Sequence, residues 1–295
     1  MISGEYLILK GAKSLALPVR LGQTMRIYES IESPSFFKWK SSHQDIAWFR
    51  AELSRKDFSI ISTNNKAVGS RLNELLCFCR ELNPAFLIDR KSYLVENNLE
   101  FNKDWGLGSS SSLISNLAYW ADIDPFLLNE KSFGGSAYDV ACARTNSAII
   151  YQLIDGHRIV TPVEFAPSFN EQLFFVWLGK KQNSSKEVKR FLKLDKGHFK
   201  EVESIGEITD EMLKAVSLYD FMRLMGEHEK LIASVIRTKK LKDRLFNDFQ
   251  GEIKSLGAWG GDFILCATER DETYVRKYFN EKNCNVICAF KKLVL

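Results

Sequence analysis

The chain has 295 residues, of which 45% are apolar and 26% charged, and Lys+Arg 41 against Asp+Glu 37 give a formal net charge of +4. At roughly 150 residues per domain this length predicts about two domains, and the composition excludes a disordered chain. The small and evenly spread charge argues against a nucleic-acid-binding surface. No apolar run approaches the roughly 20 residues of a membrane span, and no signal peptide opens the chain. We therefore expect a cytoplasmic protein with no membrane partner.

The first half of the chain is predicted to be rich in strands. Strand patterns cover residues 5–9, 14–20, 24–28 and 93–101, whereas residues 70–80 have helical spacing. A polar segment with two glycines then leads into a helical pattern that begins at Leu113. This segment is expected to join a strand to a helix N-terminus.

The second half combines strand and helix patterns. Strands are predicted at residues 148–153, 172–178, 263–267 and 286–290, and helices at 209–225, 227–237, 239–249 and 274–280. This order favours an α+β protein of two closely packed domains, residues 1–160 and 161–295.

The segment Trp105–Ser112 (WGLGSSSS) is the strongest candidate for chemistry. Glycines let the backbone approach a ligand closely, and a helix N-terminus directs free N–H groups and a positive dipole end at it. Serine hydroxyls can bind phosphate oxygens or a hard cation such as Mg²⁺. The alternative is a serine helix cap beside a glycine turn. Because Gly-Lys-Ser/Thr is missing, the segment is not a P-loop.

Asp139 follows a glycine pair and precedes the apolar run Val140–Ala143. A buried carboxylate is costly unless it is paired, and a paired one can accept a proton from a hydroxyl group. The alternative role for Asp139 is a helix N-cap.

Two further segments are candidates for contact with a substrate. Gly257–Asp262 (GAWGGD) has three glycines and leads directly into an apolar strand, so it is either a loop packed against a ligand or an ordinary turn. Gly179–Ser185 follows a strand and could hold an anion, or it is a solvated basic loop. The four histidines lack metal-ligand spacing, which disfavours a zinc hydrolase.

Taken in order, these segments resemble the motifs of the GHMP small-molecule kinases, in the mevalonate kinase and phosphomevalonate kinase branch. Ser3–Leu9 is similar to the first motif of that family and Gly106–Ser110 to the second, more specific one. Gly135–Ala141 resembles the stretch that carries the catalytic aspartate, and Gly257–Asp262 resembles the third motif. The resemblance extends over nearly the whole chain.

The resemblance implies a two-domain GHMP kinase fold, with an N-terminal domain like domain 2 of ribosomal protein S5 and a ferredoxin-like C-terminal domain. It implies ATP and Mg²⁺ as cofactors and a small mevalonate-like alcohol as substrate, and it is compatible with a homodimer. Asp139 would be the catalytic base, and Ser110 would bind the metal, with Glu130 as a candidate carboxylate ligand. The ATP phosphates would lie against Gly106, Leu107, Gly108, Ser109, Ser110 and Ser111. The substrate and its phosphate would lie near Glu5, Lys180, Ser184, Gly257, Ala258, Gly260 and Gly261.

Three positions depart from the family pattern. A family lysine five residues before Gly4 has no counterpart in this sequence, and Lys10 or Lys13 are candidate replacements. The metal-binding glutamate of the family falls on Leu128, and Trp259 replaces a small residue.

The sequence thus predicts a kinase of a small alcohol, most like mevalonate kinase of isoprenoid biosynthesis. The alternatives are a phosphomevalonate kinase, favoured by Lys180, Lys181 and the Gly-Gly-Asp ending of the third motif, and a non-catalytic nucleotide- or metabolite-binding relative. Asp139 favours an enzyme, since a binding module has no need of this carboxylate.

Overall fold

The computed structural model describes residues 1–31, 35–182, 184–194 and 197–295. The chain forms two compact units that are not consecutive in sequence. Unit 1 contains Met1–Arg20, Asp104–Gly106 and Thr145–Leu295, and unit 2 contains Leu21–Lys103 and Leu107–Arg144. Residue 160, where the sequence predicted a boundary, lies inside a strand of unit 1. The first strand of the chain pairs with a strand more than 130 residues later, and no local sequence signal reports such a pairing.

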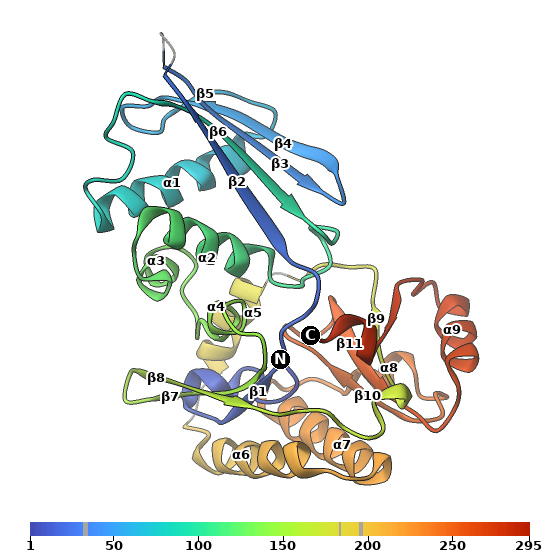
Figure 1. Cartoon of the computed structure of the whole chain (residues 1–295). Helices are drawn as coiled ribbons and strands as arrows, with labels where there is room; N and C mark the ends of the chain where they lie inside the picture. Colours follow the sequence, from blue (N-terminus) through green and yellow to red (C-terminus); the bar gives the residue numbers. More distant parts are fainter. Residues whose placement is uncertain (32–34, 183, 195–196) are drawn as a thin grey trace. The chain divides into compact units, whose positions relative to one another are not determined.

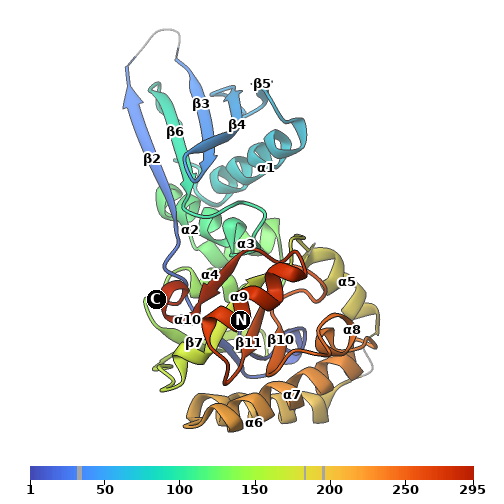
Figure 2. The ribbon, with the colours of Figure 1, turned by 90° about the vertical axis from the view of Figure 1, so that its right-hand side faces the viewer.

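Unit 2 is a five-stranded sheet with helices packed on one face (Figures 1 and 2). The strand order is β2-β6-β3-β4-β5, with β3 and β6 parallel and the other neighbours antiparallel. The strands are β2 (Gln23–Ser30), β3 (Phe37–His43), β4 (Ile46–Leu53), β5 (Ile60–Thr63) and β6 (Ser92–Leu99). The helices are α1 (Lys66–Leu82), α2 (Ser109–Ala121), α3 (Pro125–Ser132) and α4 (Tyr138–Cys142).

The alternating pattern of β3 shows why this sheet has one covered face. Phe37 and Trp39 are buried, while Lys38 and Lys40, which alternate with them, are exposed. Successive side chains of a strand point to opposite faces, so the two aromatic rings enter the core under the helices. The sequence patterns alone did not lead us to predict β3, β4 or β5.

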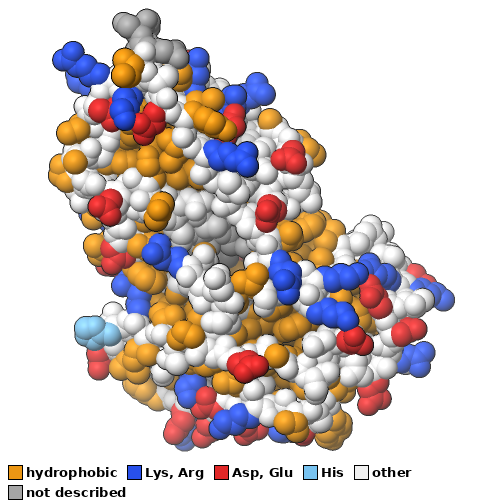
Figure 3. Space-filling view, viewed as in Figure 1, with side chains coloured by type: hydrophobic (Ala, Val, Ile, Leu, Met, Phe, Trp, Pro, Cys, Tyr) orange, Lys and Arg blue, Asp and Glu red, His pale blue; other side chains and the backbone are white. Residues whose placement is uncertain are grey.

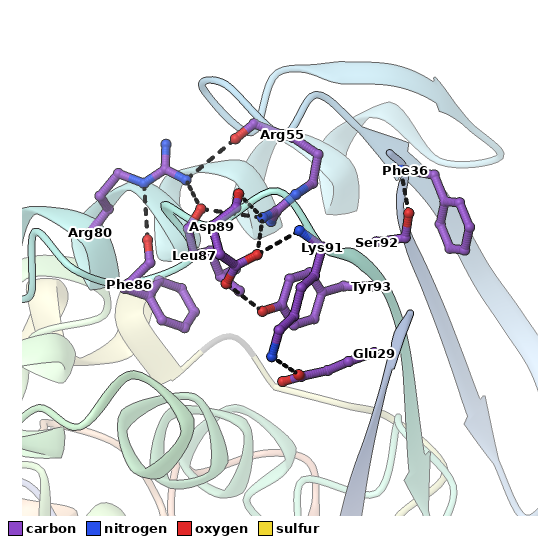
Figure 4. A network of polar contacts seen from close by, with 10 residues as sticks. All are labelled: Glu29, Phe36, Arg55, Arg80, Phe86, Leu87, Asp89, Lys91, Ser92 and Tyr93. Carbon is purple, nitrogen blue, oxygen red and sulfur yellow. Dashed lines mark hydrogen bonds and ion pairs between the residues drawn. The ribbon is translucent and has the colours of Figure 1, made fainter. Parts of the chain in front are cut away.

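Two arginines fix the turn that precedes β6 (Figure 4). The Arg55 guanidinium donates to the Asp89 carboxylate at 3.2 Å, and the Arg80 guanidinium donates to the Leu87 carbonyl oxygen at 3.1 Å. Tyr93 donates its hydroxyl proton to the other oxygen of Asp89 at 2.7 Å. Charged hydrogen bonds of this kind are stronger than neutral ones, so they hold the turn against the end of α1.

Unit 1 contains two antiparallel sheets and the remaining helices (Figure 1). One sheet has the order β1-β7-β8 and the other β10-β11-β9-β12. The strands are β1 (Ser14–Ala16), β7 (Ala148–Ile154), β8 (His157–Val163), β9 (Leu173–Trp177), β10 (Glu252–Ser255), β11 (Phe263–Ala267) and β12 (Ile287–Ala289). The α-helices are α5 (Ser184–Leu194), α6 (Phe199–Lys214), α7 (Leu218–Val235), α8 (Leu241–Leu245), α9 (Glu272–Glu281) and α10 (Phe290–Leu293), and two 3₁₀ helices are η1 (Leu7–Lys10) and η2 (Asn170–Gln172).

The strand predicted at residues 5–9 is wrong, because this segment forms the 3₁₀ helix η1. Gly4 and Gly11 on either side have φ of +90°, and Tyr6 has φ of +61°, so the backbone turns instead of extending. Leu7 and Ile8 are both buried, and a short apolar run buried on all sides carries no period that separates strand from helix.

The helix predicted at residues 209–225 is also incorrect in its bounds. It spans the end of α6 and the start of α7, which are separated by Ala215–Ser217. The Ser217 side chain accepts the N–H of Asp220 and so begins a new helix. Gly226, which separates two helices predicted from the sequence, lies within α7. The helix predicted at 227–237 is the second half of α7, and of the helix predicted at 239–249 only Leu241–Leu245 is helical. The remaining predicted strands and helices are found close to their expected positions.

Among the described helices, none combines the length and apolar character of a membrane span. On the face drawn in Figure 3, acidic and basic side chains are interspersed, and neither sign covers that face.

The core of unit 2 can be tested through α2. Leu117 is fully buried and Tyr119 on the same helix is 86% exposed. We expect Leu117→Ala to lower the free energy of unfolding by about 2–5 kcal/mol, because a cavity replaces buried methyl groups. Tyr119→Ala should change it by less than about 0.5 kcal/mol. Urea unfolding measures both, and equal effects of the two substitutions would contradict the packing described.

Candidate functional site

The N-terminus of α2 in unit 2 presents unused backbone donors. Gly108 is the residue before the helix, with φ of +86°, and no side chain caps the helix. Within the described part of the chain, the N–H groups of Ser109, Ser110 and Ser111 make no hydrogen bond. A 13-residue helix with free N–H groups and a glycine at its entrance can hold an anion such as a phosphate group.

The serine hydroxyls of this turn do not cap the helix. Ser111 Oγ donates to the Gly108 carbonyl oxygen at 2.8 Å, and Ser112 Oγ lies 2.9 Å from the same oxygen. They bond to a carbonyl group and leave the N–H groups available, so the alternative of a serine cap is wrong. Ser110 is exposed, and its hydroxyl has no hydrogen bond among the described residues, so it can serve as a metal or phosphate ligand.

Asp139 lies in the short helix α4, which packs against α2 in the same unit. The residue before this helix is Ala137, with φ of +59°, so Asp139 is inside the first turn and is not the N-cap. Its carboxylate accepts the N–H of Val140 at 3.0 Å. Burial raises the pKa of Asp139 above its ordinary value, which makes the carboxylate a better proton acceptor.

Leu128 and Glu130 differ in their suitability as metal ligands. Leu128, at the position of the family glutamate, is fully buried in the core of unit 2. Glu130 is exposed on α3. The described residues contain no group of three or more His, Cys, Asp and Glu that could hold a metal ion. The hydroxyl of Ser110 fits Mg²⁺ bound mainly by nucleotide phosphates, since this ion needs only one or two protein ligands.

In unit 1, the loop between β10 and β11 is held by the segment that follows β9. The N–H of Asp262 donates to the Lys180 carbonyl oxygen at 2.7 Å, and the N–H of Gln182 donates to Asp262 Oδ1 at 3.1 Å. A Cβ atom at Gly261 would lie 2.6 Å from the Lys180 carbonyl oxygen. This glycine is therefore required by packing of the chain against itself.

Gly106 has a similar packing role. A Cβ atom at this position would lie 2.5 Å from Cγ of Asp262, and φ is +73°. The first glycine of the WGLGSSSS segment thus contacts the third motif within unit 1, whereas Gly108 borders the free N–H groups of α2.

Trp259 anchors the centre of the loop between β10 and β11. Its ring is buried in a cluster with Tyr6, Phe191 and Ile236, and the backbone N–H of Trp259 donates to the Tyr6 hydroxyl at 3.1 Å. Burial raises the pKa of Tyr6 to about 12. The indole fills space between the N-terminal turn and α5, which explains a large side chain at this position.

A buried cluster of charged side chains includes Lys254 of β10, the strand that precedes this loop. Lys254 Nζ is 2.6 Å from Glu5 Oε1 and 3.9 Å from Glu229 Oε1. His228 Nε2 is 3.2 Å from Glu5 Oε2 and accepts the N–H of Gly4 at 3.0 Å. All four side chains are at most 2% exposed. Glu5 was expected near the substrate, but here its carboxylate is enclosed by protein.

Burial and the single ammonium group decide the charges in this cluster. Although burial opposes ionisation of Glu5, Lys254 and His228 lower its pKa to about 2. Burial, together with the negative charge of Glu5, raises the pKa of Glu229 to about 8, although Lys254 acts to lower it. Burial and Lys254 lower the pKa of His228 to about 4. At neutral pH, Glu5 is ionised, His228 is neutral and Glu229 is mainly protonated.

The sequence analysis missed this cluster, although one signal was present. The buried positions of α7 include Phe221, Leu224, Met225, His228, Glu229 and Ile232. This is the i, i+3, i+4, i+7, i+8 spacing of a core-facing helix, and the two polar residues fall on it. A charged side chain on a buried stripe requires a partner elsewhere in the fold.

The remaining predicted residues differ in their surroundings. Lys180 is exposed and lines a cavity in unit 1 together with Trp259 and Gly260. The side chain of Ser184 lies outside the part of the structure that is described. Lys13, a candidate replacement for the missing family lysine, pairs with Asp210 at 2.6 Å.

No family model and no curated protein matches the sequence. Solved structures of the GHMP kinases do match in fold. Mevalonate kinase of Methanococcus jannaschii has a TM-score of 0.69 and 18% identity, over 97% of this chain and 93% of that one. Phosphomevalonate kinase of Streptococcus pneumoniae, in complex with phosphomevalonate and AMPPNP, has 0.64 and 17%, over 98% and 95%. Galactokinase of Lactococcus lactis, complexed with galactose, has 0.63 and 13%, over 97% and 89%.

The chain therefore has the GHMP kinase fold, as the sequence resemblance predicted. The three matched structures have the names of kinases that act on different acceptors. Their similarity shows the fold of this chain and does not identify its acceptor.

The buried cluster predicts a pH dependence of stability. The folded state holds the Glu229 proton up to about pH 8, whereas an ordinary glutamate loses it near pH 4.5. This contribution to stability is therefore complete below pH 4.5 and is lost as the pH rises towards 8. Glu229→Gln removes that loss, so its free energy of unfolding relative to the wild type should rise by more than about 1 kcal/mol between pH 5 and 8.

Urea unfolding across this pH range provides the measurement, with Glu281→Gln on the exposed side of α9 as the control. The control should follow the wild-type curve. A Glu229→Gln curve parallel to the wild type would show that Glu229 is ionised in the folded state.

Proposed function

We propose that this protein is an ATP-dependent kinase that transfers a phosphoryl group to the hydroxyl of a small, mevalonate-like alcohol. The observation that carries the proposal is the N-terminus of α2, where three N–H groups and the Ser110 hydroxyl are left without partners among the described residues. The GHMP kinase fold and the carboxylate on the adjoining helix α4 support it.

Each residue has a physical task in this reaction. The N–H groups of Ser109, Ser110 and Ser111 bind phosphate oxygens and stabilise negative charge during transfer. The Ser110 hydroxyl would hold Mg²⁺, which neutralises phosphate charge when it is bound. Asp139 accepts the proton of the acceptor hydroxyl, and its raised pKa suits this role. Phosphoryl transfer needs mainly positioning and charge neutralisation, and these groups supply both.

A phosphomevalonate-like acceptor is the second candidate. The exposed Lys180 and Lys181, next to the loop that ends in Gly260–Asp262, favour an acceptor with additional negative charge. Either acceptor would place the enzyme in cytoplasmic isoprenoid biosynthesis. A binding protein without catalysis would not need the carboxylate of Asp139.

Gly108→Val tests the nucleotide site. The side chain would strain the positive φ and obstruct the approach to the free N–H groups, so ATP should no longer raise the melting temperature. Gly156→Val is the matched control, because Gly156 has φ of +78° but lies in the turn between β7 and β8. Both variants should lose about 1–2 kcal/mol of stability from backbone strain, and only the control should still be stabilised by ATP. Normal stabilisation of Gly108→Val by ATP would contradict the assignment.

Asp139→Asn tests the base. The variant should fold with a nearly unchanged melting temperature and bind ATP, yet lose at least about 10²-fold in kcat, because an amide cannot accept the proton. Asp124→Asn is the control, since Asp124 caps α3 and asparagine caps equally well. Steady-state assays with a panel of small alcohols measure both variants. An Asp139→Asn enzyme that keeps most of its turnover would remove the base assignment.

A further inference from the structure

Unit 1 contains a cavity of about 270 Å³ formed by four separate segments. The segment after β9 contributes Lys180, α5 contributes Glu187 and Arg190, and the residues around α8 contribute Lys239 and Arg244. The loop between β10 and β11 forms the remaining wall. Because all lining residues belong to unit 1, the cavity is complete within that unit.

The charge of the lining is strongly unbalanced. Lys180, Arg190, Lys239 and Arg244 are basic, and Glu187 is the acidic residue among the lining side chains. Glu187 lies 3.6 Å from Arg190 and so compensates that guanidinium group. Three cations therefore face the cavity without a carboxylate. Like charges gathered in one concave site produce a positive potential that attracts small anions.

Two basic side chains close to the cavity in sequence are paired. Lys240 forms an ion pair with Asp243 at 3.6 Å, and Lys242 pairs with Glu252 at 3.3 Å. In contrast, Lys180, Lys239 and Arg244 make no ion pair or side-chain hydrogen bond in the described ranges. The lining thus contains three unpaired cations, and Lys239 is one of them although the adjacent Lys240 is paired.

The volume of the cavity and its remaining lining residues restrict the class of ligand further. At about 30 Å³ per water, the cavity has room for a ligand of roughly ten non-hydrogen atoms. Thr238 and Ser255 add hydroxyl groups, and Ile236, Leu241 and Trp259 add apolar surface. Guanidinium and ammonium groups together bind phosphate oxygens well, and the apolar wall accommodates a short carbon chain.

We propose that this cavity binds a small molecule with at least two negative charges on a phosphate or diphosphate group. A single carboxylate would neutralise only one of the three uncompensated positive charges, so a ligand with more negative charge fits better. The site stands on the residues of unit 1 and does not depend on the proposed phosphoryl transfer. Its ligand is either the phosphate of a phosphorylated acceptor or that of a separate effector.

Calorimetric titration of the full chain with pyrophosphate tests the proposal. Lys239→Gln combined with Arg244→Gln should weaken binding at least about tenfold, since each substitution removes a charged hydrogen bond. Lys240→Gln combined with Arg223→Gln is the control, because it removes the same charge from paired side chains of unit 1 outside the cavity. The control should bind like the wild type. The cavity component should also persist in Gly108→Val, which obstructs the α2 N-terminus.

Equal affinities of the two double variants would overturn the proposal, as would a wild-type protein that does not bind pyrophosphate at millimolar concentration. Kinetic assays then distinguish the sources of the anion. If the Lys239→Gln, Arg244→Gln variant has a raised KM for a phosphorylated alcohol and little change in kcat, the anion belongs to the acceptor. If its KM is unchanged, the anion belongs to an effector. The titration requires no turnover, so its result stands even if no kinase activity is found.

Discussion

The ion pair between Glu5 and Lys254 connects parts of unit 1 that are nearly 250 residues apart in sequence. Two charges that leave water lose several kcal/mol of solvation each, and close pairing with further hydrogen bonds is needed to offset this. His228 and Glu229 of α7 complete the arrangement, so the N-terminal turn, α7 and β10 must be in place together. With one ammonium group between two carboxyl groups, Glu5 carries the charge and Glu229 retains its proton. Lys254 lies near the end of β10, so this buried ion pair fixes the start of the loop that follows the strand.

The glycines of the two glycine-rich segments have different roles, although they look alike in sequence. Around the loop between β10 and β11, Gly261 and Gly106 are required because the chain packs closely on itself, against Lys180 and Asp262. At the start of α2, Gly108 borders N–H groups that no described group of the protein uses. Glycine content alone therefore does not identify a ligand site. Unused donors beside the glycine make the α2 N-terminus a candidate site, because such groups can bind a ligand in place of water.

The same reasoning applies to the basic residues. Lys254 is enclosed and stabilises the fold, and Lys13 is held by Asp210, so neither is free for a ligand. Lys180, Lys239 and Arg244 are exposed, line a cavity of unit 1 and lack carboxylate partners among the described residues, so they are available for anion binding. Burial and pairing thus divide chemically identical side chains into those that hold the fold and those that can bind a small molecule.

Sequence patterns were enough to predict the fold class, most helices and strands, a polar turn leading into the helix at Leu113, and Asp139 as a candidate carboxylate, because these depend on local spacing and on motifs of a few residues. The three-dimensional structure was needed to show that residues 1–20 join the second half of the chain, that Glu5 is buried and paired, and that Gly106 packs on Asp262. It also brought Lys180, Lys239 and Arg244 around one cavity. Each of these features depends on contacts between distant segments, and the hydrophobic period of a single segment reports which face is buried but not which partner covers it.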